Sequence, residues 1–540
     1  MDNARPLGPD AALGIGLSGG GHRATLLGLG ALLYLADAGK GSYIRTIASV
    51  SAGSITNAYL ASLRNSPLTS GDAFVPHVAH LARKIAGNRK WWAASWTLMA
   101  GLAIWFLAML LATPIDADGL QRLVPPLLGM VAVALFVGPR SGGSLWAWRG
   151  TWLWLVLVAL SLIPGALLWR TAVGGGRRSV AAVVAFLLVG IAMFVRGHAL
   201  RYSLSRTIAP LGSRGANRGR LEDMSTHVDH VICATELHAG THTYFGRDFV
   251  YTREFGFGDP VGLPISTALH ASASFPLVFP VCILRATKHG FRFPDVDRKP
   301  RSLMVLSDGG IFDNMADGWQ LEAPDRARRL TYLNRTQKDS KVAAFVGRLK
   351  SVPQTLIVVD ATPPPASSSI TAALLPGITE LFGVARAAGV TYNNSVQTRS
   401  RDLHARFAAD SPHGAVIAAG KSPLDVVMNI LDPEKVQKPG ADVIERAMEA
   451  GNYLKTRFPG EDLSAFPALT IAGGTYLTPV GAERTAHILF HGYLQAMITL
   501  HVALGFPLLP NAPVRDDFRR LTSVGSAAPT AARNLSAAAV

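Results

Sequence analysis

The order of apolar and polar residues at the start of the chain predicts two consecutive strand–helix units. Residues 12–17 form a short apolar run that ends in glycines, and residues 24–38 are apolar around most of a helical surface, as in a buried helix. Residues 43–50 have the pattern of a second strand, and residues 54–63 that of a second helix. This order requires parallel strands joined by crossover helices, so we expect an α/β domain with a central, mostly parallel sheet flanked by helices.

A different pattern begins at Trp91. Four apolar runs follow one another, and each is close to the roughly 20 residues that cross the hydrocarbon core of a bilayer. The runs are residues 91–112, 120–138, 151–169 and 179–195. Tryptophans lie near several of their ends, as interfacial anchors do. Because four such runs in succession are hard to bury in water, we predict an inserted bundle of about four transmembrane helices.

The positions of the basic residues bear on the topology of this block. Both of its flanks are predicted to belong to one catalytic domain, so the number of spans must be even. Lysines and arginines before the first run, between the second and third, and after the fourth favour flanks on the cytoplasmic side. Arg170, Arg177 and Arg178 oppose that rule, because they follow the third run. Two spans with two helices in the membrane plane therefore stay an alternative.

Soluble character returns near residue 205. Strands are predicted at residues 230–235, 248–252, 303–306 and 355–360, a helix starts near residue 264, and residues 487–504 are apolar and helical in pattern. The last 30 or so residues are rich in Ala, Ser and Arg, which is typical of a disordered tail. The predicted organisation is a split catalytic domain (1–90 and 205–510), an inserted transmembrane block (91–204) and a disordered tail (511–540).

Composition narrows the class of partner. Of the 540 residues 49% are hydrophobic and only 16% are charged, and the formal net charge is +16. The basic balance indicates an anionic partner. Arginines beside apolar runs favour anionic lipid over nucleic acid. Two cysteines cannot form a disulfide framework, and the first residues lack a signal-peptide pattern, so we expect a catalytic region on the reducing side and membrane delivery by internal spans.

The turn after the second predicted strand carries a candidate nucleophile, Ser51. A serine on a sharp strand-to-helix turn presents its hydroxyl at a helix N-terminus, usually within G-x-S-x-G. Here Ser49 stands in place of the first glycine, and Gly53 supplies the second. The alternative is that Ser51 is only a helix N-cap.

The turn after the first strand contains Gly19, Gly20, Gly21 and Arg23. Glycines leave backbone N–H groups unobstructed at a helix N-terminus, where negative charge is favoured, so we predict an oxyanion hole. Arg23 either adds positive charge there or braces the loop. A plain tight turn is one alternative. A dinucleotide site is the other, since residues 14–19 satisfy G-x-G-x-x-G, although no acidic residue ends the second strand.

Asp308 is the best candidate for a base, because it ends an apolar strand and two glycines follow it. A plain Asp-Gly turn is the alternative, Asp360 is a rival and Asp313 a weaker one. Six histidines are weaker candidates for the base, because they fit core packing, a loop position or no particular context better: His22, His404, His413, His487, His491 and His501. No cluster has metal-ligand spacing, and no metal or cofactor is predicted.

Five blocks of sequence together resemble the patatin-like phospholipase family. They are Gly19-Gly20-Gly21-His22-Arg23, Ser51-Ala52-Gly53-Ser54, Ala234-Thr235-Glu236-Leu237 with Phe245, Ala271-Ser272-Ala273-Ser274-Phe275-Pro276 with Phe279-Pro280, and Asp308-Gly309-Gly310. The resemblance covers residues 13–90 and 205–360. It implies a Ser-Asp dyad in which Ser51 attacks a lipid ester, Asp308 takes the serine proton and later activates water, and the N–H groups of Gly20 and Gly21 hold the oxyanion.

The sequence thus predicts a membrane-anchored serine acyl-ester hydrolase acting on a phospholipid or lysophospholipid. It is expected to be a multi-pass protein of a bacterial inner membrane with its catalytic domain on the cytoplasmic side, and nucleic acid is not expected as a partner. Tethering the site at the interface suits such substrates, because moving an acyl chain into water costs about 0.8 kcal/mol per CH₂. Three alternatives remain: a lipid-binding protein without hydrolytic activity, an acyltransferase that uses the same serine, and a dinucleotide-dependent membrane enzyme.

Overall fold

The computed structural model describes residues 11–87, 197–213, 216–276, 279–293, 302–363, 396–409, 413–432, 439–472 and 480–523. The chain divides into two compact units, one of Met1–Asn88 with Leu204–Val540 and the other of Arg89–Ser203. The four apolar runs predicted to cross a membrane lie outside the described residues. Within the described ranges, no helix combines the length and the apolar character needed to cross a membrane. The following paragraphs concern the first unit.

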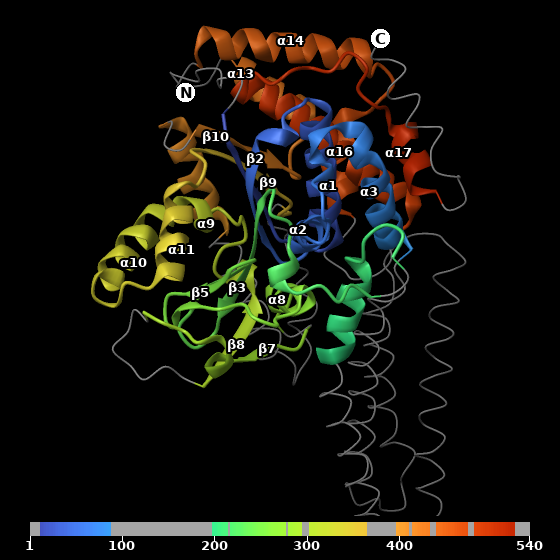
Figure 1. Cartoon of the computed structure of the whole chain (residues 1–540). Helices are drawn as coiled ribbons and strands as arrows, with labels where there is room; N and C mark the ends of the chain where they lie inside the picture. Colours follow the sequence, from blue (N-terminus) through green and yellow to red (C-terminus); the bar gives the residue numbers. More distant parts are fainter. Residues whose placement is uncertain are drawn as a thin grey trace, which may run out of the picture. The chain divides into compact units, whose positions relative to one another are not determined.

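A central sheet forms this unit, as the strand–helix pattern predicts, but it is mixed, with parallel strands on one side and antiparallel strands on the other (Figure 1). The strands are β1 (Leu13–Leu17), β2 (Ile44–Val50), β3 (Asp229–Glu236), β4 (Thr241–Gly246), β5 (Phe249–Thr252), β6 (Gly256–Gly258), β7 (Cys282–Arg285), β8 (Leu303–Asp308), β9 (Thr355–Asp360) and β10 (His413–Ala418). Eight of them follow the order β10-β9-β1-β2-β3-β4-β5-β6, while β8 pairs with β3 and β7 pairs with β8. The pairs from β10 to β3 are parallel, and those from β3 to β6 are antiparallel.

The strands β2 and β8 meet end to end along one edge of β3. Val50, the last residue of β2, pairs with Cys233 in parallel register. The next residue of β3, Ala234, pairs with Asp308, the last residue of β8, in antiparallel register. Because β2 and β8 run toward each other along this edge, the residue that leaves β2 emerges beside the carboxyl end of β8. This junction positions the candidate site.

Helices pack on the sheet and on one another. They are α1 (His22–Asp37), α2 (Gly53–Ala61), α3 (Gly71–Ala86), α8 (Ile265–Ser272), α9 (Gly318–Leu321), α10 (Ala323–Gln337), α11 (Ser340–Lys350), α13 (Pro423–Leu431), α14 (Ala441–Arg457), α15 (Phe466–Ile471), α16 (Ala482–Leu504) and α17 (Arg515–Thr522).

The helices α1 and α16 lie side by side at close range (Figure 1). A Cβ at Gly30 would lie 2.2 Å from the carbonyl oxygen of Leu489, and a Cβ at Gly492 would lie 2.4 Å from that of Leu27. Both glycines therefore let the two backbones touch. This contact explains why the predicted α1 pattern is apolar on nearly every side: one face covers the sheet and the other meets α16.

The predicted disordered tail, residues 511–540, is wrong in its first part. Residues 515–522 form α17, which packs on α16. Phe518 is fully buried and its ring lies 5.7 Å from that of Phe490 and 5.9 Å from that of Tyr493. Asp517 accepts the N–H of Val514 and so closes the first turn of the helix. Phe518, together with the buried Leu521 and Thr522, anchors a segment whose composition is typical of disorder. Residues 524–540 lie outside the described residues.

Candidate active site

The structure brings Ser51 and Asp308 together. The Ser51 hydroxyl donates a hydrogen bond to Oδ2 of Asp308 at 2.6 Å, across 257 positions of sequence. The contact follows from the strand register, since Ser51 leaves β2 where β8 ends at Asp308. Both residues were predicted as a nucleophile and its base, and the fold supplies the geometry that such a pair needs.

Ser51 lies on a sharp turn between β2 and α2. Its φ angle is 52°, a left-handed conformation that a non-glycine residue rarely adopts and that is typical of a strained functional turn. The turn is held from outside, because the backbone N–H of Ser51 donates to the hydroxyl of Ser272 at 2.9 Å. A Cβ at Gly53 would lie 2.4 Å from the carbonyl oxygen of Ser18, so only glycine lets the turn approach β1 this closely. The N-cap of α2 is Ala52 and not Ser51, and a turn with these features is typical of a nucleophile elbow.

Ser49 shows why the elbow tolerates a serine at its first small position. Its side chain is fully buried, accepts a hydrogen bond from Nδ2 of Asn57 at 2.8 Å and donates to the carbonyl of Val231 at 3.3 Å. The residue still belongs to the regular strand β2, so it requires no glycine conformation. The departure from G-x-S-x-G is thus accommodated by a satisfied buried hydroxyl.

The Asp308 carboxyl group is buried, and no cationic side chain pairs with it among the described residues. Its side chain is closed off from solvent, Oδ1 accepts the N–H of Gly310 at 2.7 Å, and Oδ2 accepts the Ser51 hydroxyl. Burial raises the pKa of Asp308 to about 6, although the hydrogen bonds from Ser51 and Gly310 lower it. A carboxylate with such a pKa is ionised at neutral pH and accepts a proton more readily than an ordinary aspartate.

The glycine turn lies against the elbow. A Cβ at Gly19 would lie 3.1 Å from the Ser51 Cβ, and the Thr25 hydroxyl of α1 donates to the carbonyl of Ala52 at 2.7 Å. Gly20 and Gly21 have φ angles of 145° and 66°, which strongly favour glycine. Neither of their N–H groups donates to an acceptor in the part of the chain that the structure describes. Both groups therefore remain as candidate donors to an anion at the N-terminus of α1.

Two members of the predicted oxyanion hole have other roles. The Gly19 N–H donates to the carbonyl of Asn314 at 3.0 Å, so it is already engaged. The Arg23 side chain is 2% exposed, and its Nε donates to the carbonyl of Ala361 at 2.8 Å. The sequence predicted that Arg23 either adds positive charge to the oxyanion hole or braces the loop. This hydrogen bond fits the second role, because it connects the glycine turn to the loop after β9.

The rival carboxylates occupy other environments. Oδ1 of Asp360 accepts the N–H of Thr362, and β1 separates its strand from β2. Asp313 accepts the N–H groups of Met315 and Gly318 and lies 3.1 Å from Nε of Arg399. Neither aspartate contacts the Ser51 hydroxyl among the described residues.

The histidines fit packing roles, as predicted for the C-terminal helix. His487, His491 and His501 are buried on α16 and each lies within hydrogen-bonding distance of a backbone carbonyl, respectively that of Phe466, Lys421 and Phe506. His22 is buried at the start of α1. Among the described residues, the Ser51 hydroxyl therefore contacts the Asp308 carboxyl group directly, with no histidine between them.

Asn314 and Ser272 belong to the site but were not singled out from the sequence. The Asn314 side chain is 3% exposed, and its Nδ2 donates to the Thr362 hydroxyl at 2.8 Å. Its Oδ1 has no hydrogen-bond partner among the described residues and lies 2.3 Å from the place a Gly19 Cβ would take. An unpaired polar atom is thus buried beside the elbow. Asn314 lies only a few residues after Asp308-Gly309-Gly310, and this closeness was the available sequence signal. Its contact with Gly19 depends on the tertiary structure and could not be predicted from the sequence.

The dinucleotide alternative does not fit the fold. Gly14 and Gly16 lie within β1 and not in the turn that would cradle phosphates. A Cβ at Gly14 would lie 1.8 Å from Oε1 of Gln320, and one at Gly16 would lie 2.8 Å from the carbonyl oxygen of Met315. These glycines therefore make room for the chain that follows β8.

Neither a scan of protein-family models nor a search of curated proteins finds a match to this chain.

Proposed function

We propose that this protein is a serine acyl-ester hydrolase of the patatin-like phospholipase type that uses Ser51 and Asp308 as a catalytic dyad. One observation carries the proposal: the Ser51 hydroxyl, on a turn with a φ angle of 52°, donates to a buried carboxylate at 2.6 Å. A nucleophile within hydrogen-bonding distance of a base is the arrangement that covalent acyl transfer requires.

The first half of the reaction forms an acyl-enzyme. Oγ of Ser51 attacks the ester carbonyl as its proton passes to Oδ2 of Asp308. The N–H groups of Gly20 and Gly21 donate to the resulting oxyanion. When the tetrahedral intermediate collapses, the bond to the leaving alkoxide breaks, and Asp308 returns the proton to that alkoxide.

The second half releases the acid. Asp308 removes a proton from a water molecule, whose oxygen attacks the acyl carbonyl. The ester bond to Ser51 breaks, and the proton on Asp308 returns to Oγ. A base with a pKa of about 6 suits both halves, because it is ionised at neutral pH yet takes up a proton without a large cost.

Apolar side chains near the dyad support an apolar acyl group as substrate. Ile311 and Phe312 follow the Asp308 turn directly and are 36% and 37% exposed. Phe275 is 47% exposed and adjoins Ser274, whose carbonyl accepts the N–H of Asp308. Exposed apolar side chains grouped beside a catalytic dyad are what a lipid surface or an acyl chain would contact.

The membrane part of the proposal rests on the sequence. We infer that residues 91–204 hold the catalytic domain at the cytoplasmic face of a bilayer and that its substrates are phospholipids or lysophospholipids. The net charge of +16 supports an anionic lipid surface.

Active-site labelling and hydrolysis by detergent-purified protein test the dyad. A fluorophosphonate probe should label the wild type and the Ser42→Ala control, since Ser42 is exposed and lies before β2, but not Ser51→Ala. Ser51→Ala and Asp308→Ala should lose at least about 10²-fold in hydrolysis of a lysophospholipid, a diacyl phospholipid or a p-nitrophenyl ester. Labelling of Ser51→Ala equal to that of the wild type, or a wild type inactive on all three substrates, would contradict the proposal.

A further inference from the structure

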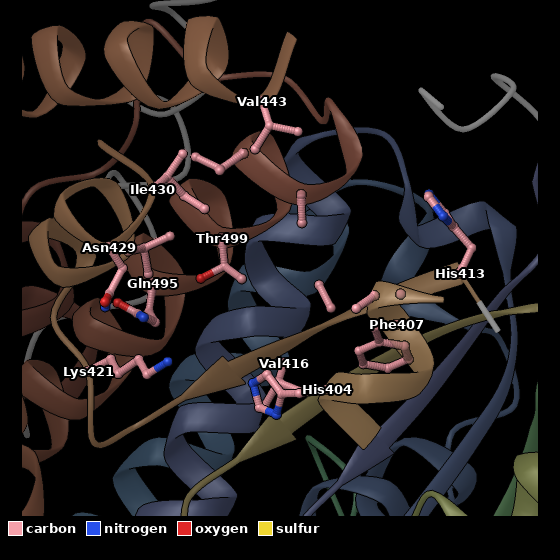
Figure 2. A pocket seen from close by; sticks show the side chains of 16 residues that line it. His404, Phe407, His413, Val416, Lys421, Asn429, Ile430, Val443, Gln495 and Thr499 are labelled. Carbon is pink, nitrogen blue, oxygen red and sulfur yellow. The ribbon is translucent and has the colours of Figure 1, made fainter. Parts of the chain in front are cut away.

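A cavity lies away from Ser51 and Asp308, on the β10 side of the parallel strands. It has a volume of about 290 Å³ and lies between β10, the helical segment of residues 396–408, α13, α14 and α16 (Figure 2). The strands β9, β1 and β2 separate β10 from β3, which carries the dyad junction. None of the elements around this cavity contributes Ser51 or Asp308.

Most of the cavity wall is apolar. The apolar lining comes from every surrounding element and consists of Phe407, Ala408, Ala415, Val416, Val426, Ile430, Val443, Val502 and Ala503. No Asp or Glu is among the described residues that line it. A lining of this kind favours a hydrocarbon group and does not repel an anion.

Two buried polar side chains in the wall lack partners. Gln495 is 1% exposed, and neither its amide oxygen nor its amide nitrogen forms a hydrogen bond with another described residue. Thr499, one helical turn further along α16, is 8% exposed and its hydroxyl is also unpaired within the described chain. Burying such groups without partners is unfavourable, so a ligand that supplies the missing hydrogen bonds would be stabilised there.

A positive charge lies at the same end of the cavity. Figure 2 shows Lys421 and the amides of Gln495 and Asn429 on the side away from Phe407. Lys421 forms no ion pair with a described residue, while its backbone carbonyl is within 3.0 Å of Nε2 of His491 on α16. The loop that carries the ammonium group is therefore attached to the helix that carries the unpaired amide.

We propose that this cavity binds the carboxylate of a medium-chain fatty acid, with the acid group at Lys421 and Gln495 and the chain along the apolar wall. A carboxylate accepts from both the ammonium and the amide N–H groups, and such charge-assisted hydrogen bonds are the stronger kind. An engineered cavity of about 150 Å³ holds one benzene molecule, so about 290 Å³ holds roughly twice as many non-hydrogen atoms, which is close to decanoate. The site is independent of the dyad.

Photolabelling of the full-length, detergent-purified Ser51→Ala protein with a diazirine-tagged decanoate tests this site without interference from turnover. Labelling should saturate and map to peptides of β10, the helical segment of residues 396–408, α13, α14 or α16, which together line the cavity. Decanoate should compete at least about tenfold better than decanol, because decanol lacks the charge that Lys421 binds. Gln495→Leu and Lys421→Met should each raise the half-saturating concentration about tenfold.

Lys455→Met is the matched control, because Lys455 is an exposed lysine of α14 and does not line the cavity. It should label like the parent protein. Lys421 is also exposed, so its replacement leaves the core intact. Lys421→Met therefore tests the proposal even if Gln495→Leu fails to fold. Labelling that does not saturate, maps to other peptides, or is unchanged in Lys421→Met would overturn the proposal.

Discussion

Asp308 is the last residue of β8, and Asp313 lies five positions further along the chain. Both side chains are buried, but their surroundings shift the pKa in opposite directions. Within the described part of the chain, the Asp308 carboxyl group accepts hydrogen bonds from uncharged donors, the Ser51 hydroxyl and the Gly310 N–H, and burial raises its pKa to about 6. Asp313 lies against Arg399 and accepts two backbone N–H groups. Although burial acts to raise the pKa of Asp313, the Arg399 guanidinium and these neighbours hold it below the ordinary value.

The Arg399 cluster is structural in character. Arg399 Nε also donates to Oδ1 of Asp317 at 2.7 Å, and burial together with the charge of Asp313 raises the pKa of Asp317 well above the ordinary value. One guanidinium thus faces a carboxylate pair and fixes the chain between β8 and α9. A carboxylate compensated by a cation and by backbone N–H groups stabilises a fold, whereas one left without a cation beside a nucleophile is poised to take a proton.

The largest expected effect is that of Asp308→Asn, which should lower the activity but raise the stability of the protein. Asp308→Asn removes the base, so hydrolysis should fall by about 10³-fold. It should also stabilise the protein at pH 8. The pKa of Asp308 in the folded protein lies above its pKa in the unfolded chain. The free energy of unfolding therefore decreases by up to about 3 kcal/mol as pH rises through about 6, and a neutral amide at this position avoids that decrease. Thermal unfolding at pH 8 measures it, and an unfolding midpoint below that of the wild type would indicate a structural role for Asp308.

Asp313→Asn should have the opposite effect, a lower stability with nearly unchanged activity. Arg399 would lose one of its two close partners in a buried setting, so the free energy of unfolding should decrease by about 2 kcal/mol. Activity per folded molecule should stay within about tenfold of the wild type, because Asp313 does not contact Ser51. Asp402→Asn is the control, since Asp402 forms an exposed pair with Arg406 and its removal should change little. Equal loss of activity at Asp313 and Asp308 would remove the distinction between the two residues.

The smallest expected effect is the pH dependence of the wild-type rate. Because Asp308 must be ionised to accept the serine proton, kcat/KM should fall about tenfold per pH unit below a pKa of about 6. An aspartate with an ordinary pKa would keep its full rate to below pH 5. Measurement of kcat/KM between pH 4.5 and 8 distinguishes a raised pKa from an ordinary one, and circular dichroism confirms that the protein stays folded. A rate that does not change from pH 5 to pH 8 would mean that the Asp308 environment does not raise its pKa.

Much of the fold and the two residues of the Ser51–Asp308 contact could be predicted, because the signals are local. The period of the apolar residues indicated β1, α1 and β2, and the small residues around Ser51 indicated a tight turn. Asp308 was identifiable from its position at a strand end before two glycines. The strand β10 and the helix α17 were missed, since their patterns are weak and each depends on a neighbour, β9 or α16, to bury it.

The sequence by itself determined that two strand–helix units present a serine and a glycine turn, and that four apolar runs interrupt the chain. Only the tertiary structure decided that β2 and β8 share one edge of β3, which places Ser51 against Asp308 and leaves Arg399 to Asp313. It also decided that the Gly19 N–H pairs with Asn314 and that Arg23 braces the loop after β9. The physical reason is that hydrogen-bond partners and desolvation depend on groups hundreds of residues apart, which no local pattern encodes.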